Sequence, residues 1–258
     1  MLKYITFIFF MFFVKTLIEQ NIITRIPMNV FNEFSVIFYI TSGLYYVVRY
    51  LMSKYSVQFN KIQPSHKKMY VVKNYIKSFF LAGLCTQLFK FSGLLTGTLD
   101  VMLIKKCAIY YVMNDIIGLL LVKKLPSTTK IHHLTTTICG ILIVMYQTNK
   151  LNVLTLIVLY AMFSSLAFCV NFYLGLRIYS SSVQLKRYLS NISFWVYLVS
   201  CLVNWVLQAI LAVSVIPTVS ITHTVIYLAF LYSVGKDDII LMKWLYDDHK
   251  KFKEIMQQ

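Results

Sequence analysis

Residues 152–176 contain no Asp, Glu, Lys or Arg, and this stretch constrains the fold more than any other part of the chain. About 20 apolar residues suffice for a helix to cross a membrane, because each residue adds about 1.5 Å to a helix. Of all 258 residues, 59% are apolar and 13% are charged, whereas soluble domains carry about 25% charge. The sequence therefore predicts an all-α, polytopic membrane protein and excludes an ordinary soluble domain.

Further apolar runs predict a transmembrane helical bundle of six to eight spans. We expect helices at roughly 4–22, 29–51, 70–92, 101–122, 127–147, 152–176, 188–214 and 219–242. The sequence leaves open whether 4–22, which resembles an uncleaved anchor, and 219–242 cross the membrane. We expect three parts: N-terminal transmembrane or anchor helices with a basic cytosolic loop (1–63), a main transmembrane domain (64–250) and a basic cytosolic tail (251–258).

The basic residues interrupt the apolar runs instead of forming one patch. There are 25 Lys and Arg against nine Asp and Glu, a formal net charge of +16. This pattern indicates membrane topology and contact with anionic lipid, and we expect no nucleic-acid partner. Seven basic residues lie in one connection: Arg49, Lys54, Lys61, Lys67, Lys68, Lys73 and Lys77. The positive-inside rule places that connection in the cytosol, with an internal membrane such as the endoplasmic reticulum as the expected location.

Asp115 is the first candidate functional residue, because it lies about 12 Å inside its helix from Lys123. A carboxylate at that depth must be paired, protonated or in contact with water. It either stabilises the bundle or acts as an acid, a base or an anchor for a substrate. His132 and His133 begin the next helix at a similar depth, and the short connecting loop makes the two helices antiparallel neighbours. We expect one histidine to contact Asp115 and the other to face a second helix.

The helix expected at 188–214 carries a continuous polar stripe, and Asn171 adds a polar position to the preceding helix. The stripe consists of Ser193, Tyr197, Ser200, Asn204 and Gln208. In lipid such a stripe must face the interior of the bundle or a cavity. It serves either adhesion between helices or the lining of a lipid chamber, and both alternatives remain open.

Other polar or reactive groups carry weaker signals. The five cysteines lie in apolar stretches without metal-ligand spacing, so we expect buried thiols and no metal site. The segment Lys236–Asp238 is interpreted as a charged cluster at the membrane boundary. A retinal Schiff base at Lys236 is a minor alternative, because such a lysine belongs in the desolvated middle of a helix.

Asp115, Lys123-Lys124-Leu125 and the pair His132-His133 at the start of the next span resemble the TLC (TRAM, Lag and CLN homology) family of multi-pass membrane proteins. The likeness covers residues 64–250 in helix order and 107–140 in motif. Among its members, ceramide synthases are acyl-CoA-dependent transferases with a double-His helix and later acidic residues. The resemblance implies that Asp115, His132 and His133 carry over as catalytic residues if this chain is a transferase. The expected later acidic stretch is missing at 164–171.

The sequence therefore predicts a membrane protein that binds, senses or remodels membrane lipids, with catalysis left open. The alternative is a lipid acyltransferase in which a histidine oriented by Asp115 acts as general base. No cofactor is expected, and acyl-CoA would be a co-substrate only under that alternative. Membrane lipids are the expected partners. A homo-oligomer or protein partner is compatible with the sequence, which does not identify one.

Overall fold

The computed structural model describes residues 28–93, 100–145 and 152–255, together with the isolated positions 8, 11 and 15. Regular structure in this part of the chain is helical, which confirms the all-α prediction. The α-helices are α2 (Met28–Tyr55), α3 (Val57–Asn60), α4 (His66–Cys85), α6 (Val101–Leu121), α7 (Ser127–Met145), α8 (Val153–Ser164), α9 (Phe168–Tyr179), α10 (Val183–Val215) and α11 (Ile221–Ile255). The 3-10 helices are η1 (Leu88–Ser92), η2 (Ser165–Ala167) and η3 (Ile216–Thr218).

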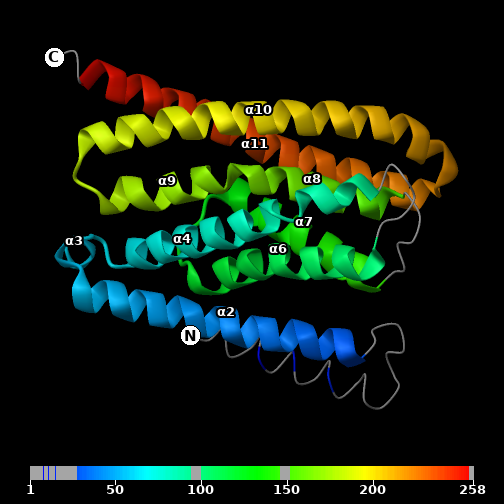
Figure 1. Ribbon diagram of the computed structural model, residues 1–258, viewed down its shortest axis with the longest axis horizontal. Coiled ribbons are helices and arrows are strands. Elements are labelled where there is room, and N and C mark those ends of the chain that lie inside the picture. Colours follow the sequence, from blue (N-terminus) through cyan, green and yellow to red (C-terminus); the bar gives the residue numbers. More distant parts are fainter. Residues whose placement is uncertain are drawn as a thin grey trace.

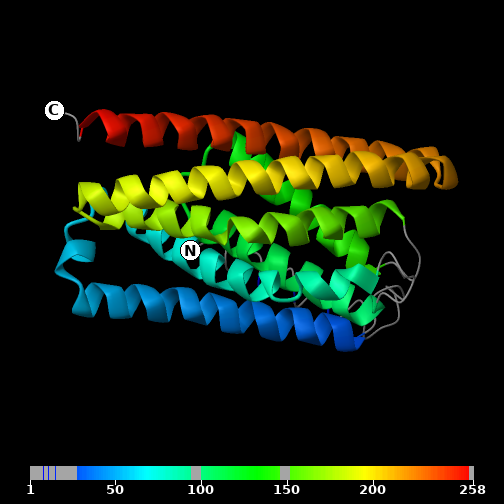
Figure 2. The same ribbon diagram turned by 45° about the horizontal axis from the view of Figure 1, so that its top comes forward.

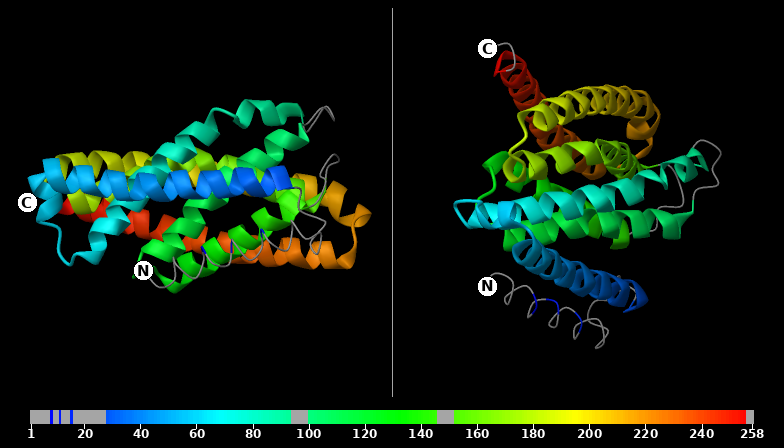
Figure 3. Two further views of the ribbon diagram at one scale, coloured as in Figure 1. Left: turned by 90° about the horizontal axis from the view of Figure 1, so that it is seen from below. Right: turned by 60° about the vertical axis from the view of Figure 1, so that its left-hand side comes forward.

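The long helices form an elongated bundle (Figure 1). Helices α10 and α11 lie side by side as a long hairpin along one side of the molecule (Figure 2). Helix α2 lies on the opposite side, as the right-hand view of Figure 3 also shows. Helix α7 packs against α6, α8 and α11, so residues on α7 can contact both the middle of the bundle and the α11 side.

Within the described part of the chain, three helical segments are long and apolar enough to cross a membrane: Val30–Tyr55, Val153–Tyr179 and Val183–Thr218. The second joins α8, η2 and α9, and it contains the charge-free stretch on which the membrane prediction rests. Helix α4, by contrast, carries four lysines. Six to eight spans therefore stay a prediction.

Several helix bounds differ from those expected, and the helix expected at 4–22 lies outside the described residues apart from isolated positions. Helix α4 covers His66–Cys85 instead of 70–92. Helix α11 continues to Ile255, well past 242, because its polar second half still packs on the bundle. Leu245 is fully buried there, and the Tyr173 hydroxyl donates a hydrogen bond to Asp248. Most of the predicted basic tail is thus helical.

Local sequence explains where the helices begin and how closely they pack. Asp100 caps α6 by accepting a hydrogen bond from the Met102 N–H, and Asn152 caps α8 in the same way. A Cβ on Gly140 of α7 would lie 2.5 Å from Val112 Cγ1 of α6, so glycine is needed for the close approach of these helices. The cysteines are free: Cys107, Cys139 and Cys201 are buried, and Cys85 and Cys169 are half-buried.

Candidate functional site

Asp115 is the centre of a buried network that joins α4, α6 and α7. Its side chain is 0% exposed, and its Oδ1 accepts a hydrogen bond of 2.6 Å from Lys77 Nζ. Thr136 Oγ1 donates to Oδ2 at 3.0 Å. His133 Nδ1 lies 2.9 Å from Oδ1. The predicted contact between Asp115 and a histidine is confirmed, and His133 makes it.

His133 lies between a carboxylate and an ammonium group. Its Nδ1 faces Asp115, and its Nε2 lies 3.0 Å from Lys73 Nζ. A neutral imidazole that carries its proton on Nδ1 lets Nε2 accept from the Lys73 ammonium, so each group keeps its ordinary hydrogen-bonding role. His133 is therefore held in place from both sides.

Sequence reasoning missed Lys73 and Lys77, because it counted both among the cytosolic loop charges. They are four residues apart on α4 and so share one face of that helix. Both are buried. Gly118 of α6 makes room for the first of them, since a Cβ there would lie 3.1 Å from Lys73 Cε. The signal available in the sequence was a pair of lysines at helical spacing among apolar residues.

The acidic residues of α11 form the other side of the site, so the interpretation of this segment as a boundary cluster is wrong for them. Asp238 is buried and accepts hydrogen bonds from Tyr160 OH at 2.5 Å and Tyr197 OH at 2.7 Å. Asp237 Oδ2 lies 3.6 Å from His132 Nδ1. Lys236 is exposed and points elsewhere, as expected of a boundary residue and not of a desolvated Schiff-base lysine.

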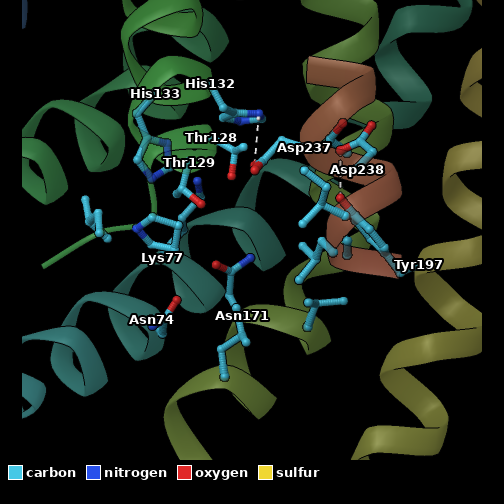
Figure 4. Close-up of a pocket in the computed structure, with 18 of the residues that line it drawn as sticks. Asn74, Lys77, Thr128, Thr129, His132, His133, Asn171, Tyr197, Asp237 and Asp238 are labelled. Atoms are coloured by element: carbon cyan, nitrogen blue, oxygen red, sulfur yellow. Dashed lines mark hydrogen bonds and ion pairs between the residues drawn. The ribbon is translucent and has the colours of Figure 1, made fainter. Parts of the chain in front are cut away.

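A pocket of about 290 Å³ lies between the two sides, lined by α4, α7, α9, α10 and α11. In Figure 4, Asp237 points toward His132, Asp238 toward Tyr197, and Asn171 extends from α9 into the space between the helices. Apolar side chains complete the wall, among them Leu81, Val170, Leu174 and Leu241. The arrangement combines a histidine–carboxylate pair, which can exchange a proton, with surfaces suited to charged and apolar parts of one ligand.

The sequence-predicted residues divide between this pocket and the helix contacts around it. His132, His133, Asn171 and Tyr197 line the pocket, and Asp115 lies directly behind His133. The remaining members of the polar stripe are buried away from the lining: Ser193, Ser200, Asn204 and Gln208.

Three of those stripe residues join helices. Ser193 Oγ donates to the Cys169 carbonyl at 3.2 Å, and Asn204 Nδ2 donates to the Tyr160 carbonyl at 3.1 Å. Gln208 Nε2 donates to the carbonyl of Leu156 at 3.2 Å. The prediction that the stripe faces the interior is confirmed, and its bonded amides and Ser193 attach α10 to α8 and α9.

Asp115, His132 and His133 also have the spacing of a metal site, since one ligand atom of each lies within 4.8 Å of the others. Lys77 Nζ and Lys73 Nζ nevertheless contact Asp115 and His133 directly. Two ammonium groups beside the same ligands repel a divalent cation and already supply the positive charge that the carboxylate needs. The geometry therefore favours an ammonium-balanced network over a metal centre.

Comparisons with protein-family models, with curated proteins and with solved structures give no match for this chain.

Proposed function

We propose that this chain is a multi-pass membrane protein that binds, senses or remodels a membrane lipid in the pocket between α4, α7, α9 and α11. The observation that carries the proposal is the composition of the pocket, in which charged groups and apolar side chains line one cavity. An amphipathic ligand matches such a lining, because its headgroup needs polar partners and its chains need apolar ones. The three long apolar helices supply the membrane setting.

Membership of the TLC family over residues 64–250 is part of this proposal. The contact between Asp115 and His133 supports it, since the resemblance rests on an aspartate helix followed by a double-histidine helix. Asp237 and Asp238 supply carboxylates near His132, although they come from α11 and not from the stretch at 164–171 where the resemblance would have them.

We further propose that the basic connections face the cytosol from an internal membrane such as the endoplasmic reticulum. Lys67 and Lys251 are both exposed, one before α4 enters the bundle and one near the end of α11. Single cysteines at these positions, in a background without the native cysteines, should react with an impermeant reagent from the same side of sealed vesicles. Reaction from opposite sides would refute this topology.

Lipid analysis of the purified protein tests the binding proposal with two matched asparagine variants. Asn171 lines the pocket, whereas Asn204 lies outside it and bonds the Tyr160 carbonyl. Asn171→Leu should change which lipids copurify, relative to the bulk membrane, in protein of unchanged thermal stability. Asn204→Leu should lower stability and leave the lipid profile of the folded fraction unchanged. A profile equal to bulk lipid in the unaltered protein, or one unaffected by both Asn171→Leu and His132→Ala, would overturn lipid binding in this pocket.

A lipid acyltransferase is the second candidate, favoured by the position of His132 in the pocket with Asp237 3.6 Å from its Nδ1. In that reaction His132 Nε2 takes a proton from a lipid amine or hydroxyl, whose N or O attacks the thioester carbonyl of acyl-CoA. The carbon–sulfur bond then breaks, and the thiolate takes the proton back as the amide or ester forms. Transfer of labelled acyl chains that is abolished by His132→Ala and retained in Lys236→Ala would establish it, and the absence of transfer in lipid-loaded protein would exclude it.

A further inference from the structure

We propose that the pocket selects a zwitterionic headgroup, in which a phosphate is joined to a primary ammonium by a short linker, on a membrane phospholipid. This inference rests on the proposed lipid binding and names the class of lipid. It follows from which charged groups of the pocket already have hydrogen-bond partners in the protein and which do not.

Most charged groups at the site have partners within the bundle. Lys77 bonds Asp115, Lys73 bonds His133, and Asp238 accepts from two tyrosines. Each of these groups already has a partner, so a ligand relieves less of the cost of burial there than at a group that has none. The groups that gain most from a ligand are therefore those with weak or no partners.

Arg177 of α9 is the cation available on the basic side. Its guanidinium carbon lies 4.0 Å from the centre of the Trp244 ring, and its Nε is buried without a hydrogen bond. Among the residues that the structure describes, none forms an ion pair or a hydrogen bond with it. The indole holds the guanidinium plane in place, and guanidinium edges bind phosphate oxygens through two parallel hydrogen bonds. Arg177 is thus positioned as an anion receptor that lines the pocket.

Asp237 of α11 is the anion available on the other side. Its contact with His132 is 3.6 Å long, beyond hydrogen-bond range, and no other described residue donates to its carboxylate. Asn171, which projects between the two sides, likewise has no hydrogen-bond partner in the described part of the chain (Figure 4). A primary ammonium carries three N–H donors and can satisfy Asp237 and the Asn171 carbonyl together. A quaternary ammonium has no N–H donor, so it can attract the Asp237 carboxylate by charge but can hydrogen-bond to neither group.

The two receptors share one pocket, which favours a short linker. Arg177 and Asp237 both line the pocket of about 290 Å³, and Trp244, against which Arg177 stacks, lies two turns from Asp237 on α11. A headgroup whose phosphate and ammonium are joined by two carbon atoms, as in a phosphoethanolamine group, is small enough for that space. Leu174, Ile240 and Leu241 line the same pocket and offer contacts to the apolar part of the lipid.

Competition in detergent micelles tests the inference with four defined probes: dioleoyl phosphatidylethanolamine, phosphatidylcholine and phosphatidylglycerol, and water-soluble glycerophosphoethanolamine. Bound lipid is counted by native mass spectrometry of the full chain. We expect the ethanolamine lipid to bind about tenfold more tightly than the choline lipid, because only the former can hydrogen-bond to Asp237. The soluble headgroup should compete weakly, since it lacks the acyl chains.

Two charge variants separate the receptors, with Lys236→Gln as a control for an exposed charge beside Asp237. Asp237→Asn should reverse the preference from the ethanolamine lipid to the anionic glycerol lipid. Arg177→Gln should weaken binding of both the ethanolamine lipid and the glycerol lipid. Equal or tighter binding of the choline or glycerol lipid to the unaltered protein would overturn the headgroup inference and leave lipid binding intact. Equal competition by the soluble headgroup would overturn the assignment to a membrane lipid, and binding of none of the probes would overturn both proposals.

Discussion

Replacing Lys77 by methionine removes the shortest contact of Asp115 while keeping an unbranched side chain of similar length. Lys77 Nζ and Asp115 Oδ1 are 2.6 Å apart, and the two side chains are 8% and 0% exposed. Loss of one partner from a buried ion pair costs about 3–5 kcal/mol, because the remaining charge stays desolvated. Asp115 keeps its contacts with Thr136 and His133, so we expect the free energy of unfolding to fall by about 3 kcal/mol, or about a 150-fold change in the folding equilibrium.

We expect that adding Asp115→Asn to Lys77→Met restores most of the lost stability. The single variant Asp115→Asn leaves the Lys77 ammonium buried and should also destabilise the fold, whereas the double variant removes both charges. We expect a coupling energy of about 2 kcal/mol between the two sites. Reversible unfolding in mixed micelles of increasing sodium dodecyl sulfate content, followed by circular dichroism, measures it. Lys67→Met, an exposed position on the same helix, serves as the control. The buried ion pair would be refuted if the double variant lost the sum of the two single-variant losses in unfolding free energy, to within about 0.5 kcal/mol.

Two further substitutions test the packing and the acidic side of the site. Gly140→Ala should destabilise the bundle by about 1–3 kcal/mol, since its Cβ would meet a valine methyl of α6. Gly83→Ala, with nothing within 4 Å of the new Cβ, should be neutral or stabilising in the same thermal assay, and equal losses at both positions would contradict the close approach. Tyr197→Phe should cost about 1–3 kcal/mol because Asp238 loses one of its two donors, and an unchanged melting temperature would show that this bond is not needed.

The helices and one contact of the site could be predicted from the sequence because they depend on local information. Apolar runs predicted the main helices, and the short loop after Lys123 made α6 and α7 neighbours. That proximity was enough to predict that Asp115 contacts a histidine. The interior position of the stripe on α10 followed from its helical spacing alone.

The remaining partners could not be predicted, because they depend on which distant helices meet. Lys73 and Lys77 were assigned to a cytosolic connection by their charge, although α4 carries them into the bundle. Asp237 and Asp238 looked like boundary residues because the apolar run ends near them. Asp238 meets its two tyrosines, and Asp237 comes near His132, only when α11 folds back along α7 and α10. The composition, with only nine acidic residues, does not show which basic or polar residue each of them contacts.

The bonds from α10 to the backbone of α8 and α9 have a consequence for biogenesis. Carbonyls at interior positions of a helix, such as those of Leu156 and Tyr160 in α8, already accept one bond within the helix, so they do not need α10 as a partner when α8 enters lipid. The amides of Asn204 and Gln208 are in a different position, since lipid offers them no partner until they reach the carbonyls of Tyr160 and Leu156. The segment made first thus acts as a template for insertion of the next. A detached α10 segment should be retained in the bilayer less efficiently than one that follows α8 on the same nascent chain.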